Sequence, residues 1–364
     1  MAKFTDVFLD ATKDGHKIPK ENYLSQGSYP IIDQGQEYIA GFSNESTGLY
    51  ENVPAIIFGD HTRIFKYVYQ PFFLGADGVK LLKAKDSNAN YKYLYYALCQ
   101  ARIPNTGYNR HFKWLKEVEI RIPSQDEQQH IVMVLDKVNS LIDLRKQQLN
   151  KLDELVKARF VEMFGDPVQN PLEWATGSLL EMGYCKNGMN FHTGDSGIEM
   201  HCLGVGDFKD YSAIDGTDYL PKISLNETPP EESMLQDGDI VFVRSNGNKA
   251  LVGRCLVVYP RKTPTTYSGF CIRYRLTDGE VDTIYLLYVL KTDSMRKKMV
   301  GRGANIQNLN QQILATLDIP IPPLKLQKQF AAFVEQANKS KLIIQQSLDK
   351  LEVLKKSLMQ EYFG

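Results

Sequence analysis

The chain has 364 residues, with 43 basic and 43 acidic side chains, so its formal net charge is zero. This length predicts two or three domains rather than one. No stretch of 18 uncharged apolar residues occurs, so we expect no membrane-spanning helix and no contact with a membrane. The first residues, MAKFTDVFLDATKDGHK, lack the apolar segment of a secretory signal. The five cysteines are scattered without a C-x-x-C pair, which favours a reducing, cytoplasmic location.

Residues 1–123 are predicted to form a first α+β domain. Short apolar runs at 29–33, 55–58 and 78–82 lie between glycine, asparagine and aspartate, as strands do. Arg63 follows the second run. A polar loop before residue 112 contains Asn109, Arg110 and His111. These residue types suit contacts with nucleic-acid bases and phosphates, although a solvated basic face is the more common explanation of any one charge cluster.

Residues 124–165 are predicted to form one long helix. Apolar residues recur at alternating steps of four and three, and the average spacing of 3.5 is typical of a coiled-coil seam. Its seam residues include Leu135, Leu149 and Leu152. Gly165, followed by Asp166-Pro167, predicts the end of the helix.

Residues 166–322 are predicted to form a second α+β domain, with strands at 238–243 and 254–259. Residues 240–277 hold seven Lys or Arg side chains and no acid. Arginine pairs well with guanine, and asparagine with adenine, so the polar residues of two loops are candidates for base contact. They are Arg244, Asn246, Asn248 and Lys249 in one loop and Asn305 and Asn308 in the other.

Residues 323–364 are predicted to form a second long helix, whose seam includes Val334, Leu348 and Leu351. Basic residues interrupt the two seams at different positions. This favours pairing of the two helices with each other, although each helix could instead pack on its own domain.

The two helices belong to an internal repeat. Residues 120–165 align without a gap with residues 319–364, at an offset of 199, and 14 of 46 positions are identical. A second block, 93–98, matches 285–290 at an offset of 192. The period is too long for a solenoid and indicates duplication of a domain plus a helix.

Motifs of catalysis are missing from the sequence. It has no G-x-x-x-x-G-K-[ST] phosphate loop, no H-E-x-x-H, no G-x-S-x-G and no Asn/Asp-Pro-Pro-aromatic tetrapeptide. His192 and His201 could form part of a metal site, but surface or capping roles are the favoured interpretation. We therefore expect neither a catalytic nor a metal site.

Taken together, these features resemble the DNA-specificity (S) subunits of Type I restriction–modification systems. The resemblance spans nearly the whole chain. It rests on two dissimilar domains, each followed by an Ile-x-Ile-Pro-x(4)-Gln junction, at 120–128 and 319–327, and a long helix. The loops GYNRHFKWL and GANIQNL before the junctions, and the strand GDIVFVRSN, are also similar to the family pattern. The first junction departs from it by having Ser124-Gln125 where the second has Pro323-Leu324.

The resemblance implies an α+β protein with two target-recognition domains, 1–123 and 166–322. They are separated by two helices, 124–165 and 323–364, that pair as an antiparallel coiled coil with pseudo-two-fold symmetry. Such a subunit is not an enzyme: each domain reads one half of a split DNA site, and the helices set the gap. Its partners are double-stranded DNA, two methyltransferase subunits docked on the helices, and restriction subunits held through the complex.

The resemblance places the S-adenosylmethionine, ATP and Mg sites on those partners, so we expect no cofactor on this chain. The DNA-contact candidates are then Arg63, Asn109, Arg110, His111, Arg244, Asn246, Asn248, Lys249, Asn305 and Asn308. The main alternative is a coiled-coil assembly scaffold without a DNA role, which would be indifferent to DNA and salt. An unrecognised enzyme is a third reading and predicts turnover by the isolated chain.

Overall fold

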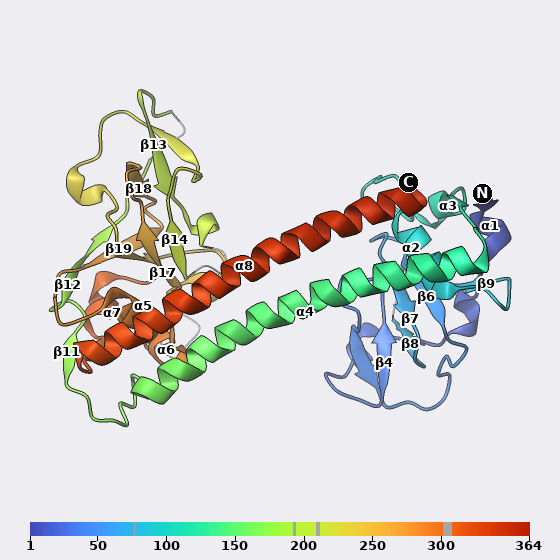
Figure 1. Cartoon of the computed structure of the whole chain (residues 1–364), viewed down its shortest axis with the longest axis horizontal. Helices are drawn as coiled ribbons and strands as arrows, with labels where there is room; N and C mark the ends of the chain where they lie inside the picture. The colour runs from blue at the N-terminus through green and yellow to red at the C-terminus, as the bar shows by residue number, and fades with distance from the viewer. Residues whose placement is uncertain (76, 192–193, 209–211, 301–307) are drawn as a thin grey trace. The chain divides into compact units, whose positions relative to one another are not determined.

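The chain folds into two compact units. The structure, a computed structural model, describes residues 1–75, 77–191, 194–208, 212–300 and 308–364. Unit 1 consists of Met1–Gln148 with Ile344–Gly364, and unit 2 consists of Leu149–Ile343 (Figure 1). Each long helix therefore contributes one end to unit 1 and the other end to unit 2.

Unit 1 contains two four-stranded sheets, of order β2-β9-β6-β7 and β3-β8-β4-β5, and a two-stranded pairing of β1 with β10. The predicted strands at 29–33, 55–58 and 78–82 are confirmed as β4, β6 and β9. The elements are β1 (Ala2–Lys3), α1 (Phe4–Val7), β2 (Phe8–Asp10), β3 (Lys17–Ile18), β4 (Tyr29–Ile32), β5 (Gly41–Ser43), β6 (Ala55–Gly59), β7 (Phe65–Val68), β8 (Phe73–Gly75), β9 (Val79–Ala84), α2 (Tyr91–Cys99), α3 (Phe112–Leu115), β10 (Glu119–Ile120) and α4 (Gln125–Phe164).

Unit 2 contains a five-stranded sheet of order β12-β19-β16-β17-β14, a three-stranded sheet β15-β13-β18 and the pair β11-β20. The strands predicted at 238–243 and 254–259 are confirmed as β16 and β17. The elements are β11 (Thr176–Ser178), β12 (Gly183–Asn187), β13 (Ile198–Leu203), β14 (Ala213–Asp215), β15 (Lys222–Leu225), β16 (Asp239–Val243), β17 (Cys255–Tyr259), β18 (Thr265–Tyr267), β19 (Cys271–Leu276), α5 (Thr283–Lys291), α6 (Asp293–Val300), α7 (Gln311–Ala315), β20 (Asp318–Pro320) and α8 (Leu324–Phe363).

The two units repeat the same topology, although their domains share little sequence. The order β2-β9-β6-β7 in unit 1 is matched by β12-β19-β16-β17 in unit 2. Strands β4 and β8 pair in parallel, as do β13 and β18. Helices α2 and α5 follow β9 and β19, and the pair β1-β10 is matched by β11-β20. The α+β duplication predicted from the sequence is thus confirmed, whereas the residue boundaries of the recognition domains stay a prediction.

Two of the repeated residues make the same hydrogen bond in both units. The hydroxyl of Tyr93 donates to the carbonyl of Arg121 (2.7 Å), and that of Tyr285 donates to the carbonyl of Pro320 (2.9 Å). In the junction motif, Gln128 Nε2 donates to the Pro123 carbonyl (2.9 Å).

Gln327 Nε2 donates equivalently to the Pro322 carbonyl (2.7 Å). Both glutamines are buried, and a buried amide needs such partners. The Ile-x-Ile-Pro-x(4)-Gln motif therefore locks the start of each long helix onto the strand before it.

The far end of each long helix completes the core of the other repeat's domain. Phe164, at the end of α4, packs edge-on against Tyr285 of unit 2, with ring centroids 4.8 Å apart. Its repeat equivalent Phe363, at the end of α8, packs against Tyr93 of unit 1 at 5.4 Å. Gly165 ends α4 with φ of +74°, a left-handed conformation that favours glycine.

Contacts inside each unit show that α4 and α8 run antiparallel. In unit 2, Asp153 of α4 forms an ion pair with Lys341 of α8, and Phe160 packs on Phe330 with ring centroids 5.4 Å apart. In unit 1, Lys146 Nζ lies 3.6 Å from Glu352 Oε1. Residues later in α4 thus contact residues earlier in α8, so the two helices run antiparallel, as the predicted coiled coil requires.

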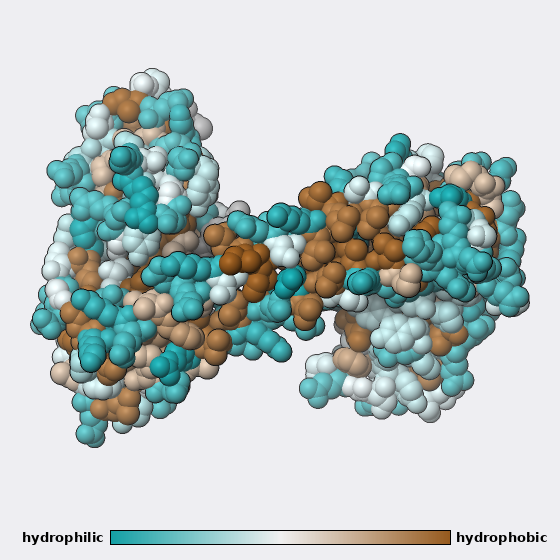
Figure 2. Space-filling view, viewed as in Figure 1, coloured by the Kyte–Doolittle hydropathy of each residue, from teal (hydrophilic) through white to brown (hydrophobic). Residues whose placement is uncertain are grey.

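The predicted seam residues all lie away from solvent to some degree. Leu135, Val334 and Leu348 are buried. Leu149, Leu152 and Leu351 are half-buried. Other apolar side chains of the helices are exposed, and Figure 2 shows hydrophobic surface on them. The larger exposed ones are Met133, Leu144, Leu155 and Val161 on α4 and Leu342, Ile343, Val353 and Leu354 on α8.

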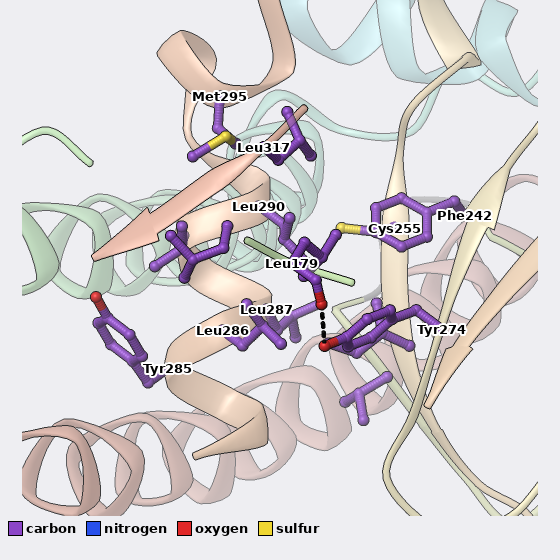
Figure 3. Packing of buried hydrophobic residues seen from close by; sticks show 14 of the residues in the cluster. Leu179, Phe242, Cys255, Tyr274, Tyr285, Leu286, Leu287, Leu290, Met295 and Leu317 are labelled. Atoms are coloured by element: carbon purple, nitrogen blue, oxygen red, sulfur yellow. Dashed lines mark hydrogen bonds between the residues drawn. The ribbon is translucent and has the colours of Figure 1, made fainter. Parts of the chain in front are cut away.

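The larger hydrophobic cluster of unit 2 lies between helix α5 and the five-stranded sheet. Leu286, Leu287 and Leu290 of α5 are buried together with Phe242 and Cys255 of the sheet (Figure 3). The one polar group that Tyr274 brings into this core is satisfied, because its hydroxyl donates to the Leu179 carbonyl (2.9 Å). The dense packing makes this sheet a rigid base for the loops at its ends.

The buried glutamine of the second junction gives a stability prediction. Replacing Gln327 by alanine removes donors to Pro322 and Glu280 and the acceptor of the Asp282 amide (2.8 Å). We expect the free energy of unfolding to fall by roughly 1–3 kcal/mol, measured by chemical denaturation. The exposed neighbour Gln329 on the same helix is the matched control. Equal, small effects of both substitutions would show that these hydrogen bonds do not stabilise the junction.

Candidate nucleic-acid interface

In unit 1 three segments meet where β6 ends, and Asp60 holds them together. The Asp60 amide donates to the Gly78 carbonyl (2.7 Å), and its Oδ1 accepts from the Phe112 amide (2.7 Å). The Asp60 carbonyl accepts from the His111 amide (2.8 Å) and lies 2.9 Å from His111 Nδ1. We call the described residues 60–64, 77–78 and 104–111 tip 1.

The four predicted residues of unit 1 all lie in tip 1, but in different environments. Asn109 and Arg110 are exposed. Arg63 is half-buried, has φ of +61°, and donates from Nη1 to the Ile103 carbonyl (3.4 Å). His111 is fully buried and anchors the loop to Asp60. Its assignment as a DNA contact stays a prediction, and in this structure its ring is enclosed by the fold.

Tip 1 also contains an exposed aromatic residue that the sequence pattern does not predict. Tyr108 is 88 % exposed, and its ring stacks on that of His61 with centroids 4.7 Å apart and planes 10° apart. Tyr108 and His61 both lie in polar segments of the sequence. Because they are 47 positions apart, only the fold shows that they form one surface feature.

In unit 2 the equivalent segments meet where β16 ends. The Leu309 amide donates to the Arg244 carbonyl (2.8 Å), and Ser245 forms an isolated bridge with Asn308. The Arg244 amide donates to the Phe270 carbonyl (2.8 Å). We call the described residues 244–248, 268–270 and 308–310 tip 2. The structure thus brings Arg244, Asn246, Asn248 and Asn308 together in one tip, and their contact with DNA stays a prediction.

Hydrogen bonds fix several of these side chains in the loops. Arg244 Nη1 donates to the Gly269 carbonyl (3.3 Å). Asn246 Oδ1 accepts from the Asn248 amide (2.7 Å), and Asn248 Oδ1 accepts from the Ala250 amide (3.0 Å). Each amide oxygen therefore shapes the turn, while the amide NH2 groups are the donors suited to a base edge.

The remaining residues predicted as DNA contacts in unit 2 differ in exposure and in whether the structure describes them. Lys249 and Asn308 are exposed, and Asn305 lies outside the described residues. Phe270, in the turn after β18, is 62 % exposed and was not predicted as a site residue.

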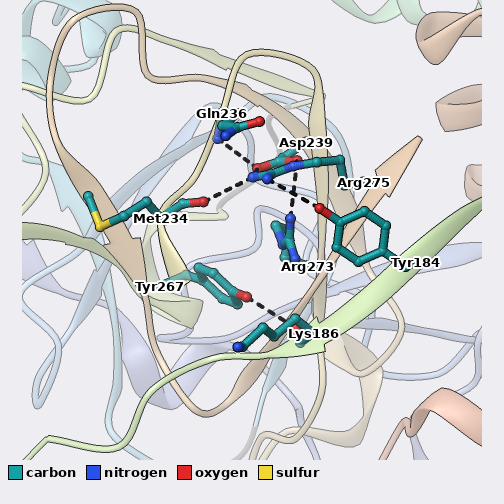
Figure 4. A network of polar contacts seen from close by, with 8 residues as sticks. All are labelled: Tyr184, Lys186, Met234, Gln236, Asp239, Tyr267, Arg273 and Arg275. Carbon is teal, nitrogen blue, oxygen red and sulfur yellow. Dashed lines mark hydrogen bonds and ion pairs between the residues drawn. The ribbon is translucent and has the colours of Figure 1, made fainter. Parts of the chain in front are cut away.

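Part of the basic run in unit 2 serves the core instead of the surface. Arg275 donates from Nε and Nη2 to the two carboxylate oxygens of Asp239, both at 2.8 Å, and Asp239 is 1 % exposed (Figure 4). The Asp239 hydrogen bonds raise the pKa of Arg275 above its usual value. Arg261 is likewise paired with Asp215 and Asp237. The acid-free run of sequence is therefore neutralised in part by acids outside it.

Arg273 is completely buried beside this pair. Its Nη1 lies 3.9 Å from Asp239 Oδ1, too far for a hydrogen bond, and none of its three nitrogens has a hydrogen-bond partner among the described residues. Its guanidinium lies 4.9 Å from the centre of the Tyr184 ring. The guanidiniums of Arg273 and Arg275 lower the pKa of Tyr184. Asp239 thus offsets part of the charge of the buried Arg273 and the half-buried Arg275.

The described residues contain no group of three or more His, Cys, Asp or Glu side chains that could hold a metal ion. His201 Nδ1 lies 2.8 Å from the Leu220 carbonyl, and His192 lies outside the described residues. Among the helices of the described part of the chain, none is long and apolar enough to cross a membrane.

Two stretches of the chain, residues 2–154 and 205–353, match the family model described as Type I restriction modification DNA specificity domain. The chain belongs to this family. One match falls in each repeat, and tip 1 and tip 2 both lie within the matched stretches.

Curated relatives are subunits of the same kind. The chain is 27 % identical over 269 residues to the specificity subunit of the Type I restriction enzyme StySPI from Salmonella potsdam, covering 68 % of this chain and 57 % of that protein. It is 26 % identical over 197 residues to the EcoR124I/EcoR124II specificity subunit from Escherichia coli, covering 44 % and 49 %. The chain thus spans about half the length of these relatives.

Solved structures share the fold at low identity. The S subunit of the Type I restriction–modification system from M. genitalium superposes with a TM-score of 0.58 at 17 % identity, covering 100 % of this chain and 95 % of that one. A chain from a structural study of the assembly and conformational transition of the Type I system gives 0.56 at 14 % identity, covering 100 % and 95 %. The specificity-subunit fold is therefore shown for this chain.

The buried carboxylate of Asp239 gives the prediction of this subsection. Replacing it by alanine leaves Arg273 and Arg275 without their counter-charge. We expect a loss of roughly 3–5 kcal/mol in unfolding free energy, because an unpaired buried charge is costly. Asp237, two residues earlier, pairs with Arg261 at an exposed position, and its replacement should cost less than about 1 kcal/mol. Similar losses for both variants, measured by denaturant unfolding, would contradict the role given to Asp239.

Proposed function

We propose that this chain is the non-catalytic DNA-specificity subunit of a Type I restriction–modification complex. The observation that carries the proposal is the family match to both repeats, together with equivalent polar loops at the same end of the central sheet in both units. In this proposal tip 1 reads one half of a split DNA target and tip 2 reads the other half.

The chemistry of the tips supports base reading. Arg110 in tip 1 and Asn246 in tip 2 present donors of the kind that pair with guanine and adenine in the major groove. Asn109 is exposed, and its Nδ2 donates to the Thr106 carbonyl within tip 1. The lysine beside tip 2, Lys249, suits a phosphate. The zero net charge of the chain means that much of the attraction for the DNA backbone comes from its partners.

The exposed apolar residues of the helices support two docking sites for methyltransferase subunits. Leu144 of α4 and Ile343 of α8 are equivalent in the repeat, and so are Leu155 and Leu354. Leu144 and Leu354 belong to unit 1, close along the helices to the Lys146–Glu352 ion pair.

Leu155 and Ile343 belong to unit 2, close along the helices to the Asp153–Lys341 pair. Each unit therefore carries the same exposed apolar pair, as two copies of one partner would require.

The remaining parts of the proposal concern the complex. The partners hold S-adenosylmethionine, ATP and Mg, methylate adenine, and translocate and cut DNA, while this chain holds no cofactor. Restriction subunits join through the complex. The five free cysteines support a reducing, cytoplasmic compartment.

The division of labour between the units can be tested by methylome sequencing. The chain is expressed with its cognate methyltransferase in a host without adenine methylation, and N6-methyladenine is mapped on single DNA molecules. We expect a split motif that disappears without this chain. Exchanging residues 166–322 for those of another family member should change one half of the motif and leave the other half and the gap unchanged. A change in both halves would refute the division, and no new methylation would favour an assembly scaffold.

The docking sites can be tested by adding charge to each apolar pair. Replacing Leu144 and Leu354 by aspartate should remove one methyltransferase copy from the complex, because an interfacial apolar contact is replaced by a buried charge. Replacing Leu155 and Ile343 should remove the other copy. Light scattering of the purified complex measures the loss.

The controls are Gln147→Glu and Gln346→Glu, which add the same charge at exposed, repeat-equivalent positions of the helices. Complexes of full mass with both double variants would place the docking sites elsewhere.

A further inference from the structure

Each tip presents one large aromatic ring to solvent, and the two rings come from different loops. Tyr108 of tip 1 lies in the loop before the first junction, whereas Phe270 of tip 2 lies in the turn between β18 and β19. A tyrosine or phenylalanine buries 150–250 Å² when it is covered, so such a ring contributes strongly to binding.

The Tyr108 ring is held in place from one side. It stacks on His61, whose amide donates to Gln34 Oε1 (3.1 Å) and whose ring lies beside the Gly78 backbone. The loop around Tyr108 is closed by the Asn109 amide, which donates to the Gly107 carbonyl (2.9 Å).

Gly107 has φ of +77°, a conformation that glycine adopts without strain. One face of the Tyr108 ring is therefore fixed against the protein, and the rest is open. A ring fixed before binding loses less conformational entropy when it is covered.

The backbone of Phe270 is fixed by hydrogen bonds on both sides. The Phe270 amide lies 3.3 Å from Ser268 Oγ, and its carbonyl accepts from the Arg244 amide (2.8 Å). Phe270 is thus hydrogen-bonded through its backbone to Arg244, which the sequence predicts as a base contact. Tyr69, by contrast, is 65 % exposed but lies outside tip 1.

We propose that Tyr108 and Phe270 are specificity-determining residues, each pressing its ring against base surfaces of one half of the DNA target, and that His61 is a positioning residue for Tyr108. This rests on the proposed function. The rings supply apolar contact with base edges, such as the thymine methyl group, while the neighbouring Asn and Arg side chains supply hydrogen bonds. An aromatic ring at a base step also suits a locally opened stack.

The test uses the full chain in complex with its cognate methyltransferase. The probe is a duplex that carries the split motif found by the methylome, with each base pair changed in turn. Tyr108→Ala should weaken binding to the intact motif by roughly ten-fold and abolish discrimination at one or two adjacent positions of one half. Phe270→Ala should do the same in the other half only. Tyr108→Phe, which keeps the ring, should retain the wild-type profile.

Controls separate recognition from folding. Tyr69→Ala removes an exposed ring of unit 1 outside tip 1 and should leave both halves unchanged. His61→Ala should weaken discrimination at the Tyr108 positions, and His61→Phe, which can still stack, should restore it. Melting temperatures of the exposed-ring variants should match that of the wild type.

The results of these experiments separate a failure of the inference about the two rings from a failure of the proposed function. A wild-type chain that confers no split motif would refute the proposed function. A wild-type motif with unchanged discrimination in Tyr108→Ala and Phe270→Ala would overturn the inference and leave the function standing. An equal loss of affinity for target and unrelated DNA would also overturn it, because that result marks contact with the DNA backbone.

Discussion

The exchange of helix ends between the two repeats is the constraint on which the rest of the structure depends. Phe164 ends the first repeat but packs on Tyr285 of unit 2, and Phe363 ends the second repeat but packs on Tyr93 of unit 1. Neither core is complete without a helix that begins in the other unit. The two helices must therefore run antiparallel, and each unit's packing fixes one end of both.

In this arrangement the residues that hold the two domains and helices together are different from the residues exposed in the tips. The junction glutamines and the paired tyrosines hold strand, helix and core together through contacts that are the same in both units. The tips lie at the ends of strands and are tied down largely through backbone groups, such as the carbonyls of Asp60 and Arg244. Exposed side chains in the tips, such as those of Tyr108 and Arg110, can change without disturbing these backbone contacts.

The sequence predicted the duplicated architecture because its identities correspond to structural contacts. Gln128 and Gln327 recur since each closes the same junction, and the 3.5-residue spacing recurs since both helices bury one face. The tips could be predicted only by residue type and loop position. Residue type and loop position select His111, which is buried, and do not select Tyr108, which is highly exposed.

The sequence does not show which polar residues of the tips face solvent, and this has a physical cause. Whether a polar residue faces solvent depends on partners far away in sequence, and a one-dimensional pattern does not contain that information. Arg275 illustrates this, because it belongs to an acid-free run and yet pairs with Asp239, which lies 36 residues away.

The crossed packing of the helix ends also bears on how such a chain could have arisen. A polypeptide with a single repeat would carry a domain whose core lacks the helix end that completes it, and a helix end with no domain to cover it. Two copies could complete each other's cores by reciprocal domain swapping, and under the proposed function a symmetric dimer of that kind would recognise identical half-sites. Fusing the two copies into one gene preserves these contacts and, under the same proposal, allows the two half-sites to differ, so that an asymmetric target becomes accessible.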